Sequence, residues 1–208
     1  DKWDEYKKLL KENNIPDWYI DSCDKIKYMF PKAHATAYVS AAFRIAWYKI
    51  NRPIEYYATY FSIKSFSFDL EVMEEGYDKI SEKLAELRLK KFGLTVKEQD
   101  LISTLEIALE MTARGFKFSN VDLEKSHSKN FLIADDGITL IPPFRAIDGL
   151  GDTVANNIIT ERDNKYFLSI DDFSKRCKVS ATLTEKMRIM GILKGLPESS
   201  QISLFDLM

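Results

Sequence analysis

The chain has 208 residues, of which 45% are hydrophobic and 30% charged, and its formal net charge is −2. This charge argues against a strongly basic, stand-alone nucleic-acid binder, and the length suffices for one large or two small folded units. No apolar run is long enough to span a membrane, and two cysteines with two histidines offer no metal-ligand spacing. We therefore expect a soluble, intracellular protein with reduced thiols. Because it begins at Asp1 with no initiator methionine and shows no signal peptide, we expect a processed or excised fragment.

The first part of the chain predicts two short helices and then a long one. Residues 1–14 carry apolar side chains at helical spacing, and Pro16 opens a second run of the same kind. Pro31 can start the long helix, because its missing N–H and fixed φ suit a first turn, and Pro53 closes it. Seven residues then recur at three- and four-residue steps and predict one buried stripe: Ala35, Tyr38, Val39, Ala42, Phe43, Ala46 and Ile50.

Residues 23–53 also concentrate positive charge and aromatic rings around one histidine, His34. Six cations face the single acid Asp24. Cations interleaved with aromatic side chains suit a polyanion that carries flat bases. The free N–H groups of the first helical turn, with Lys32 beside them, predict a phosphate site. A core helix with a solvated basic rim explains the same pattern.

Three further helical runs follow, each with its own boundary signals. Pro53 opens a helix that continues to Ile63. A strongly acidic helix, capped by Ser67 or Asp69, is expected to end at Gly93. Residues 95–98 read Thr-Val-Lys-Glu, a capping box, and apolar positions continue at helical spacing until Gly115.

The pattern changes between residues 118 and 129, where the chain turns polar and loses periodicity. Residues 131–141 predict a β-hairpin, because Asp136-Gly137 is a favoured two-residue turn between strands. We therefore expect a domain boundary here, giving a helical region at residues 1–122, a small domain at 123–197 and a tail at 198–208.

Residues 144–159 resemble a helix-hairpin-helix motif, with Gly149, Leu150 and Gly151 in the hairpin. Glycines leave the backbone N–H groups open to a phosphate, and the next helix, which starts with Asp152 and Thr153, adds its dipole. Such a site reads the DNA backbone and not the bases. A tight turn between packed helices is the alternative interpretation.

A second, degenerate hairpin is expected toward the C-terminus. Residues 182–185 form another capping box, and apolar residues surround Gly191 and Gly195. Four cations support a contact with DNA, although solvated helix faces explain them equally well: Lys178, Lys186, Arg188 and Lys194.

The last residues form a polar tail that contains one short apolar motif. Gln201, Leu204 and Phe205 belong to a segment that has no core of its own to fill, so a partner's pocket is plausible. The motif resembles the short peptide by which bacterial replication proteins dock on the sliding clamp.

Together, the segment at residues 28–38, the glycine motif and the tail resemble the C-terminal region of bacterial C-family replicative DNA polymerases of the PolC type. The resemblance covers essentially the whole chain. It implies a mainly α fold, in which a helical fingers-like bundle precedes a small domain with a β-hairpin and a tandem helix-hairpin-helix unit.

The resemblance also implies roles for single residues. Tyr28 and His34 would lie against the nascent base pair, with Phe30 shaping that pocket. Lys32, together with Lys27 and Arg44, would face the triphosphate or the template strand. The hairpin residues would hold duplex phosphate: Gly149, Leu150, Gly151, Asp152 and Thr153. Gln201, Leu204 and Phe205 would bind the clamp. The implied partners are primer–template DNA, an incoming dNTP and the sliding clamp, with no membrane, in the bacterial cytoplasm.

One element of that family is missing. Its palm carries the aspartates that bind catalytic magnesium, and no Asp-x-Asp on a strand occurs here. The acidic pairs at residues 135–136 and 171–172 are expected in a turn and at a helix start, so we assign no catalytic residue, metal ligand or cofactor to this chain. We expect it to be inactive alone, with magnesium bound elsewhere in the full-length enzyme.

Two other interpretations stay open. The chain could be a stand-alone, non-catalytic helix-hairpin-helix module, for which residues 23–52 have no role toward a nucleotide. It could also be an unrelated all-α enzyme with a pocket at His34, although the sequence offers no obvious second acid or base beside it.

Overall fold

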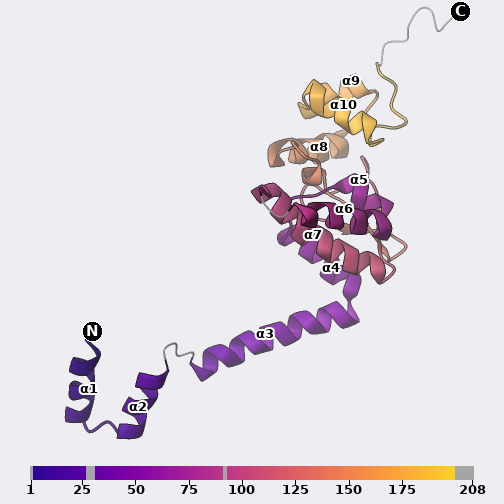
Figure 1. The fold of residues 1–208 in the computed structure, drawn as a ribbon. Coiled ribbons are helices and arrows are strands. Elements are labelled where there is room, and N and C mark those ends of the chain that lie inside the picture. Colours follow the sequence, from indigo (N-terminus) through magenta and orange to yellow (C-terminus); the bar gives the residue numbers. More distant parts are fainter. Residues whose placement is uncertain (1, 27–30, 91–92, 200–208) are drawn as a thin grey trace, which may run out of the picture. The chain divides into compact units, whose positions relative to one another are not determined.

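The structure is a computed structural model, and it describes residues 2–26, 31–90 and 93–199. The fold is mainly helical with one small sheet, as the sequence predicts (Figure 1). The chain divides into two compact units, Asp1–Ala46 and Trp47–Met208. Helix α3 (Lys32–Asn51) contributes to both. The predicted boundaries near residues 122 and 197 fall within the second unit and stay predictions.

The first unit contains α1 (Trp3–Glu12) and α2 (Asp17–Lys25), which pack against each other. Asp24 joins them, because its carboxylate accepts hydrogen bonds from Trp3 Nε1 at 2.7 Å and from Lys7 Nζ at 2.8 Å. The hydrogen bond from Lys7 lowers the pKa of Asp24, so the carboxylate stays charged across the neutral range. Both predicted helices are confirmed.

The predicted buried stripe on α3 is wrong. All seven of its residues are exposed, including Tyr38 at 68% and Phe43 at 73%. The helix itself forms between Pro31 and Pro53 as expected. Periodicity identifies an amphipathic helix, but it does not supply the surface that would cover the apolar face.

The second unit begins with four helices around a shared apolar core, which we call the helical core. They are α4 (Pro53–Ile63), α5 (Leu70–Glu75), α6 (Tyr77–Leu89) and α7 (Val96–Ala113). Fully buried side chains from them fill this core: Tyr57, Phe61, Met73, Ile80, Leu105 and Met111.

The acidic stretch after Asp69 is two helices where the sequence predicted one. Gly76 adopts φ +93° and ends α5, because a left-handed residue cannot continue a right-handed helix. Asp69 caps α5 by accepting from the Val72 N–H at 3.4 Å. The predicted capping box at α7 is confirmed, with the Thr95 side chain and Glu98 satisfying each other's backbone N–H groups.

Three short strands form the sheet in the order β1-β3-β2. The predicted β-hairpin is present, because β2 (Leu132–Ile133) runs antiparallel to β3 (Thr139–Ile141). Its connection is longer than the two-residue turn we predicted. The Ala134 N–H donates to the Thr139 carbonyl oxygen, and the Asp136 carboxylate accepts from the N–H groups of Ile138 and Thr139. Strand β1 (Lys117–Phe118), which we did not predict, pairs with β3 in parallel.

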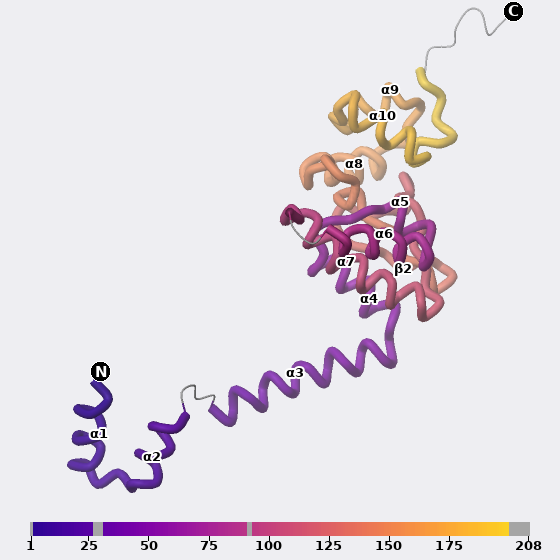
Figure 2. Tube along the Cα trace, in the orientation of Figure 1, coloured from indigo at the N-terminus to yellow at the C-terminus, as the bar shows by residue number. Residues whose placement is uncertain are grey.

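The rest of the second unit forms another core, the C-terminal core. A 3₁₀ turn, η1 (Phe144–Ala146), leads to α8 (Asp152–Asn164), α9 (Ile170–Cys177) and α10 (Ala181–Ile189). These three helices form a group of their own beside α4 to α7 (Figure 2). Phe144, Phe173 and Met187 are fully buried in this core, and Phe68 packs against both cores.

Candidate nucleic-acid interface

The glycine hairpin, residues 147–151, joins η1 to α8. Gly149 adopts φ +89° and Leu150 is only 5% exposed, so Leu150 anchors the turn in the C-terminal core as predicted. Gly151 is the N-cap of α8 and no side chain caps it. The first N–H groups of α8 therefore lack a side-chain acceptor, and they can bind an anion.

The two glycines serve different purposes. Gly149 needs its positive φ, which side chains rarely adopt. Gly151 has an ordinary φ of −77°, and a Cβ built there meets nothing within 4 Å. The fold therefore does not require glycine at position 151. What glycine provides there is an unobstructed approach to the start of α8.

Positive charge gathers around this hairpin although the whole chain is slightly acidic. Lys97, Arg145 and Lys186 line the hollows beside it, and Lys129 pairs with Asp152 at the start of α8. The Arg145 guanidinium also donates to the Ser62 carbonyl oxygen, so the lysines are the cations more open to a ligand. Two acids face them. Lys97 Nζ lies 2.6 Å from the Asp148 carboxylate, and Lys129 Nζ lies 2.9 Å from that of Asp152. These hydrogen bonds lower the pKa of both carboxyls.

A hollow of about 350 Å³ adjoins the hairpin. Its wall includes Phe66, Ser67 and Arg145 besides residues 146–151. The Phe66 ring is 76% exposed, and the Ser67 hydroxyl is buried without a hydrogen-bond partner in the described part of the chain. Cations and open backbone N–H groups beside such a hollow suit a nucleic-acid backbone.

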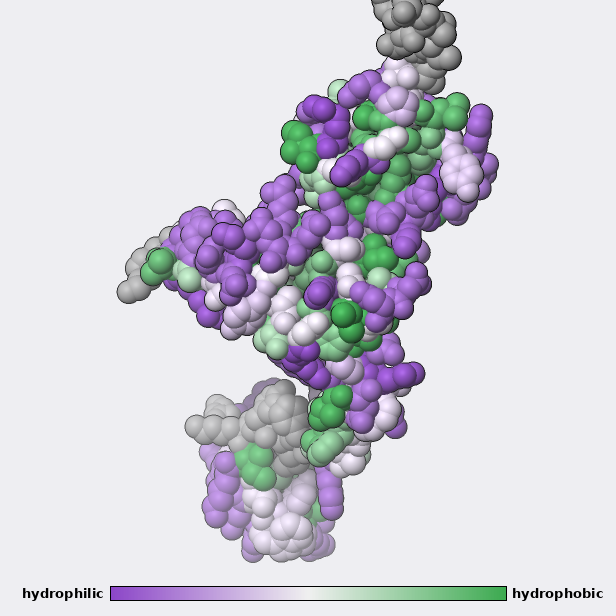
Figure 3. All heavy atoms as spheres, turned by 90° about the vertical axis from the view of Figure 1, so that its right-hand side faces the viewer, coloured by the Kyte–Doolittle hydropathy of each residue, from purple (hydrophilic) through white to green (hydrophobic). Residues whose placement is uncertain are grey.

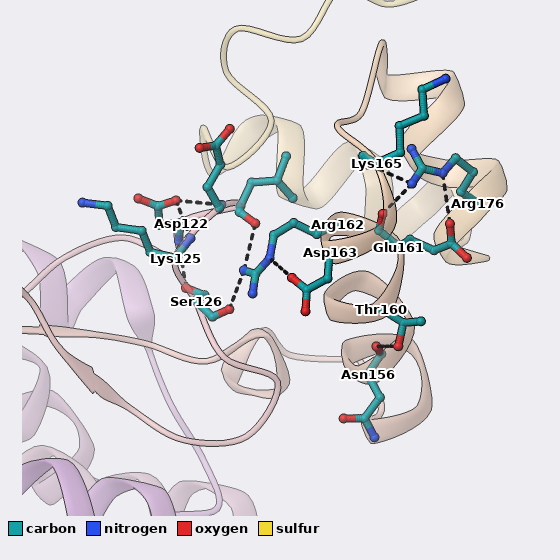
Figure 4. A network of polar contacts seen from close by, with 12 residues as sticks. Asp122, Lys125, Ser126, Asn156, Thr160, Glu161, Arg162, Asp163, Lys165 and Arg176 are labelled. Atoms are coloured by element: carbon teal, nitrogen blue, oxygen red, sulfur yellow. Dashed lines mark hydrogen bonds and ion pairs between the residues drawn. The ribbon is translucent and has the colours of Figure 1, made fainter.

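Two arginines of α8 and α9 have structural roles. Arg162 donates to the carbonyl oxygens of Leu123 and Ser126, at 3.3 and 2.9 Å, and so holds α8 to the preceding loop (Figure 4). Arg176 of α9 binds the Glu161 carboxylate at 3.0 Å and the Lys165 carbonyl oxygen at 2.9 Å. The donors of both arginines are therefore engaged within the fold.

The turn that resembles the glycine hairpin lies at residues 178–180, between α9 and α10, which corrects our sequence assignment. Lys178 takes φ +57°, Val179 is 7% exposed, and the Ser180 hydroxyl caps α10 by accepting from the Leu183 N–H at 3.3 Å. We call it the lysine turn. The predicted cap, Thr182, is already inside α10.

The glycines that suggested a second hairpin lie elsewhere. Gly191 and Gly195, with φ of +77° and +98°, follow the end of α10. They connect no two helices in the part of the chain that the structure describes. Positive-φ glycines are common after helices, so their spacing alone is a weak signal of a helix-hairpin-helix unit.

The predicted nucleotide contacts on α3 do not form one cluster. Lys32 and His34 lie in its first turn, where no acidic residue occurs, and the His34 ring is 4.5 Å from the Tyr38 ring, centroid to centroid. Arg44 lies twelve residues further, about 18 Å along the helix. Lys27, Tyr28 and Phe30 lie outside the described residues, as do Gln201, Leu204 and Phe205.

The sequence did not single out Phe66, Lys97, Lys129 or Arg145 for this site. Lys97 and Asp148 are 51 positions apart, and no local pattern announces that α7 begins beside the glycine hairpin. The described residues contain no group of three or more His, Cys, Asp or Glu that could hold a metal ion. None of the helices in those residues is both long and apolar enough to cross a membrane.

Comparison with known proteins assigns the class first. A family model described as a helix-hairpin-helix motif matches residues 115–201. This match includes both the glycine hairpin and the lysine turn, so the C-terminal half of the second unit is a helix-hairpin-helix module.

The whole chain has more specific relatives. Proteins named DNA polymerase III PolC-type are 51% identical over 203 residues in Streptococcus suis and 49% identical over 204 residues in Lacticaseibacillus paracasei. The matches cover 97% and 98% of this chain but only 14% of each relative. The chain is therefore homologous to a segment of the DNA polymerase III PolC-type proteins, which confirms the predicted resemblance.

Proposed function

We propose that this chain is the part of a replicative DNA polymerase that grips the primer–template duplex. The observation that carries the proposal is the start of α8, which has no side-chain cap and lies behind glycines that leave its N–H groups open. The surrounding cations support it. Backbone N–H groups and lysines bind phosphate without reading bases, which a polymerase that copies any sequence requires.

We extend the proposal to the incoming nucleotide through α3 and the segment before it. Tyr28, Phe30 and His34 contact the nascent base pair, and Lys32 binds the triphosphate, with Lys27 and Arg44 facing nucleotide or template. The absence of acids from the first turn of α3, with Lys32 as its first residue, supports this role. Charge reversal at Lys32 should raise the KM for dNTP in the longer polymerase, and an unchanged KM would remove this contact.

The tail binds the bacterial sliding clamp through Gln201, Leu204 and Phe205. A linked contact of this kind works at high effective concentration, so a weak peptide suffices for tethering. The paired substitution Leu204→Ala and Phe205→Ala should abolish binding to the clamp while duplex binding is retained. Unchanged affinity in a direct titration of the clamp would contradict this role.

Phosphoryl transfer belongs to another part of the longer protein. It uses magnesium ions held by acidic residues, and the described residues offer no such group. We therefore expect no polymerase activity from this chain alone. Its residues bind and position duplex and nucleotide, in the bacterial cytoplasm.

The decisive experiment compares Gly151→Glu with Gly151→Ala. Position 151 accepts a side chain without strain, so both variants should fold, as circular dichroism can check. The glutamate places a negative charge at the phosphate site, and we expect roughly a tenfold or greater loss of affinity for a labelled primer–template duplex. The alanine should change affinity by about twofold or less. Binding should weaken with salt and ignore sequence.

Equal affinity of the two folded variants would contradict the proposal. The glycine hairpin would then be a tight turn between packed helices and nothing more. Measuring fluorescence anisotropy at two salt concentrations separates phosphate contacts, which weaken with salt, from other contacts.

A further inference from the structure

Asp148, the residue directly before Gly149, is contacted by lysines from two different helices. Lys97 Nζ, in the first turn of α7, lies 2.6 Å from its carboxylate. Lys186 Nζ, on α10, lies 2.9 Å from its backbone carbonyl oxygen and 3.8 Å from its carboxylate. Helix α7 packs in the helical core and α10 in the C-terminal core. The two cores therefore bring their lysines together on one acid of the glycine hairpin.

The surroundings of this acid favour an anion from outside. The hollow beside the hairpin and a second hollow of about 310 Å³ share Lys97, Asp148 and Ser67 in their walls. The Ser67 hydroxyl is buried and has no hydrogen-bond partner among the residues described. Two ammonium groups beside these hollows bind a phosphate better than a carboxylate, because phosphate has more acceptor oxygens.

We propose that Lys97 and Lys186 are ligands for a duplex phosphate, and that Asp148 is an internal anion that holds them until the phosphate replaces it. The inference rests on the proposed function, because it names further contacts of the same duplex grip. The pair is easily broken: the side chains of Lys97 and Asp148 are each 61% exposed, and exposed ion pairs are weak. A lysine that moves to a phosphate also releases counterions, which favours the exchange.

Asp148 therefore lowers the affinity for duplex, because its carboxylate competes with phosphate. Before a phosphate gains both lysines, it must displace the carboxylate from Lys97, and Lys186 must leave the Asp148 carbonyl oxygen. A polymerase has to release each phosphate as the duplex moves past, and an internal competitor at the grip suits that need. A carboxylate that only braces the hairpin would have the opposite effect on binding when it is removed.

The test is Asp148→Asn, which keeps the shape of the side chain and removes its charge. We expect the 208-residue chain with this change to bind a labelled duplex about threefold to tenfold more tightly. The matched control is Glu82→Gln. Glu82 forms an exposed ion pair with Lys79 at 2.9 Å on α6 and lines neither hollow. The control has the same net charge as Asp148→Asn and should change affinity by less than about twofold.

Substituting the lysines provides a second measurement, the salt dependence of duplex affinity. This dependence should not change if Asp148 only braces the hairpin. Lys97→Ala and Lys186→Ala should each weaken binding and reduce the slope of log affinity against log salt by about one. In either background, much of the gain from Asp148→Asn should disappear. The control Lys79→Ala should leave the slope unchanged. Should an alanine variant fail to fold, Lys97→Gln and Lys186→Gln keep most of the side chain.

The outcomes separate the inference from the proposed function. If Gly151→Glu abolishes duplex binding but folded Asp148→Asn binds no more tightly than Glu82→Gln, the inference is wrong and the duplex grip stands. If neither the wild type nor Asp148→Asn binds duplex, both are rejected. Tighter binding by Asp148→Asn alone, lost with the lysines, supports both.

Discussion

The glycine hairpin and the lysine turn follow the same local plan with different side chains. Each has a residue at positive φ, then a buried apolar residue, then the N-cap of a helix. The glycine hairpin leaves its helix start uncapped, whereas Ser180 caps α10 in the lysine turn. The same backbone can therefore serve binding in one place and packing in another. The difference lies in whether a side chain occupies the first N–H groups of the helix.

Apolar burial is a feature that both turns share, and its removal should have the largest effect. Leu150→Ala should lower the free energy of unfolding by about 2–4 kcal/mol, because it leaves a cavity in the C-terminal core. Val179→Ala removes fewer buried atoms and should cost about 1.5 kcal/mol. Urea titrations give both values. If Val179→Ala costs as much as Leu150→Ala, the lysine turn contributes as much to the core as the glycine hairpin does, and the expected order is wrong.

Substitutions of the residue at positive φ should have the second-largest effect on stability, and they should act in opposite directions in the two turns. Gly149→Ala puts a Cβ at φ +89° and should cost about 1–2 kcal/mol of stability. Lys178→Gly relieves a left-handed lysine at φ +57° and should raise stability by about 0.5 kcal/mol. Thermal unfolding of both variants tests the pair. A destabilised Lys178→Gly would show that the lysine side chain contributes a contact that outweighs its backbone strain.

Substitutions at the two N-cap positions should have the smallest effect on stability. Adding a cap at the glycine hairpin should also weaken duplex binding. Ser180→Ala should cost about 1 kcal/mol, because the Leu183 N–H loses its acceptor. Gly151→Ser should add a few tenths of a kcal/mol and weaken duplex binding, because its hydroxyl competes with phosphate for the same N–H groups. Chemical unfolding and duplex titration measure the two effects. Unchanged duplex affinity in Gly151→Ser would show that phosphate does not use the start of α8.

Exposed hydrophobic side chains do not by themselves identify the proposed duplex-binding surface. Hydrophobic side chains lie among hydrophilic ones near the C-terminal end of the second unit (Figure 3). Tyr166 and Ile189 are 79% and 73% exposed, comparable with Phe66 beside the glycine hairpin at 76%. An exposed ring is therefore not a specific signal, whereas at the glycine hairpin an uncapped helix start coincides with cations from other helices.

The sequence alone determined the features that depend on neighbours in the chain. Proline positions bounded α3 and α4, the residues from Thr95 to Glu98 formed the expected capping box, and Gly149-Leu150-Gly151 formed the expected hairpin. Local signals also have local failures. Gly76 divides the acidic stretch that we predicted as one helix, and Ser180 rather than Thr182 caps α10. At Gly76 a positive φ ends the helix, and at α10 the helix begins two residues earlier than the predicted cap implied.

Only the tertiary structure decided which distant residues meet. It left the apolar face of α3 exposed, because a helical pattern cannot specify what covers it. It also brought Lys97 and Lys186 to Asp148 from helices in two different cores. Such contacts depend on how the cores pack, and packing over long sequence separations leaves no periodic trace in the chain. The duplex grip was therefore predictable as a motif, but its charged surroundings were not.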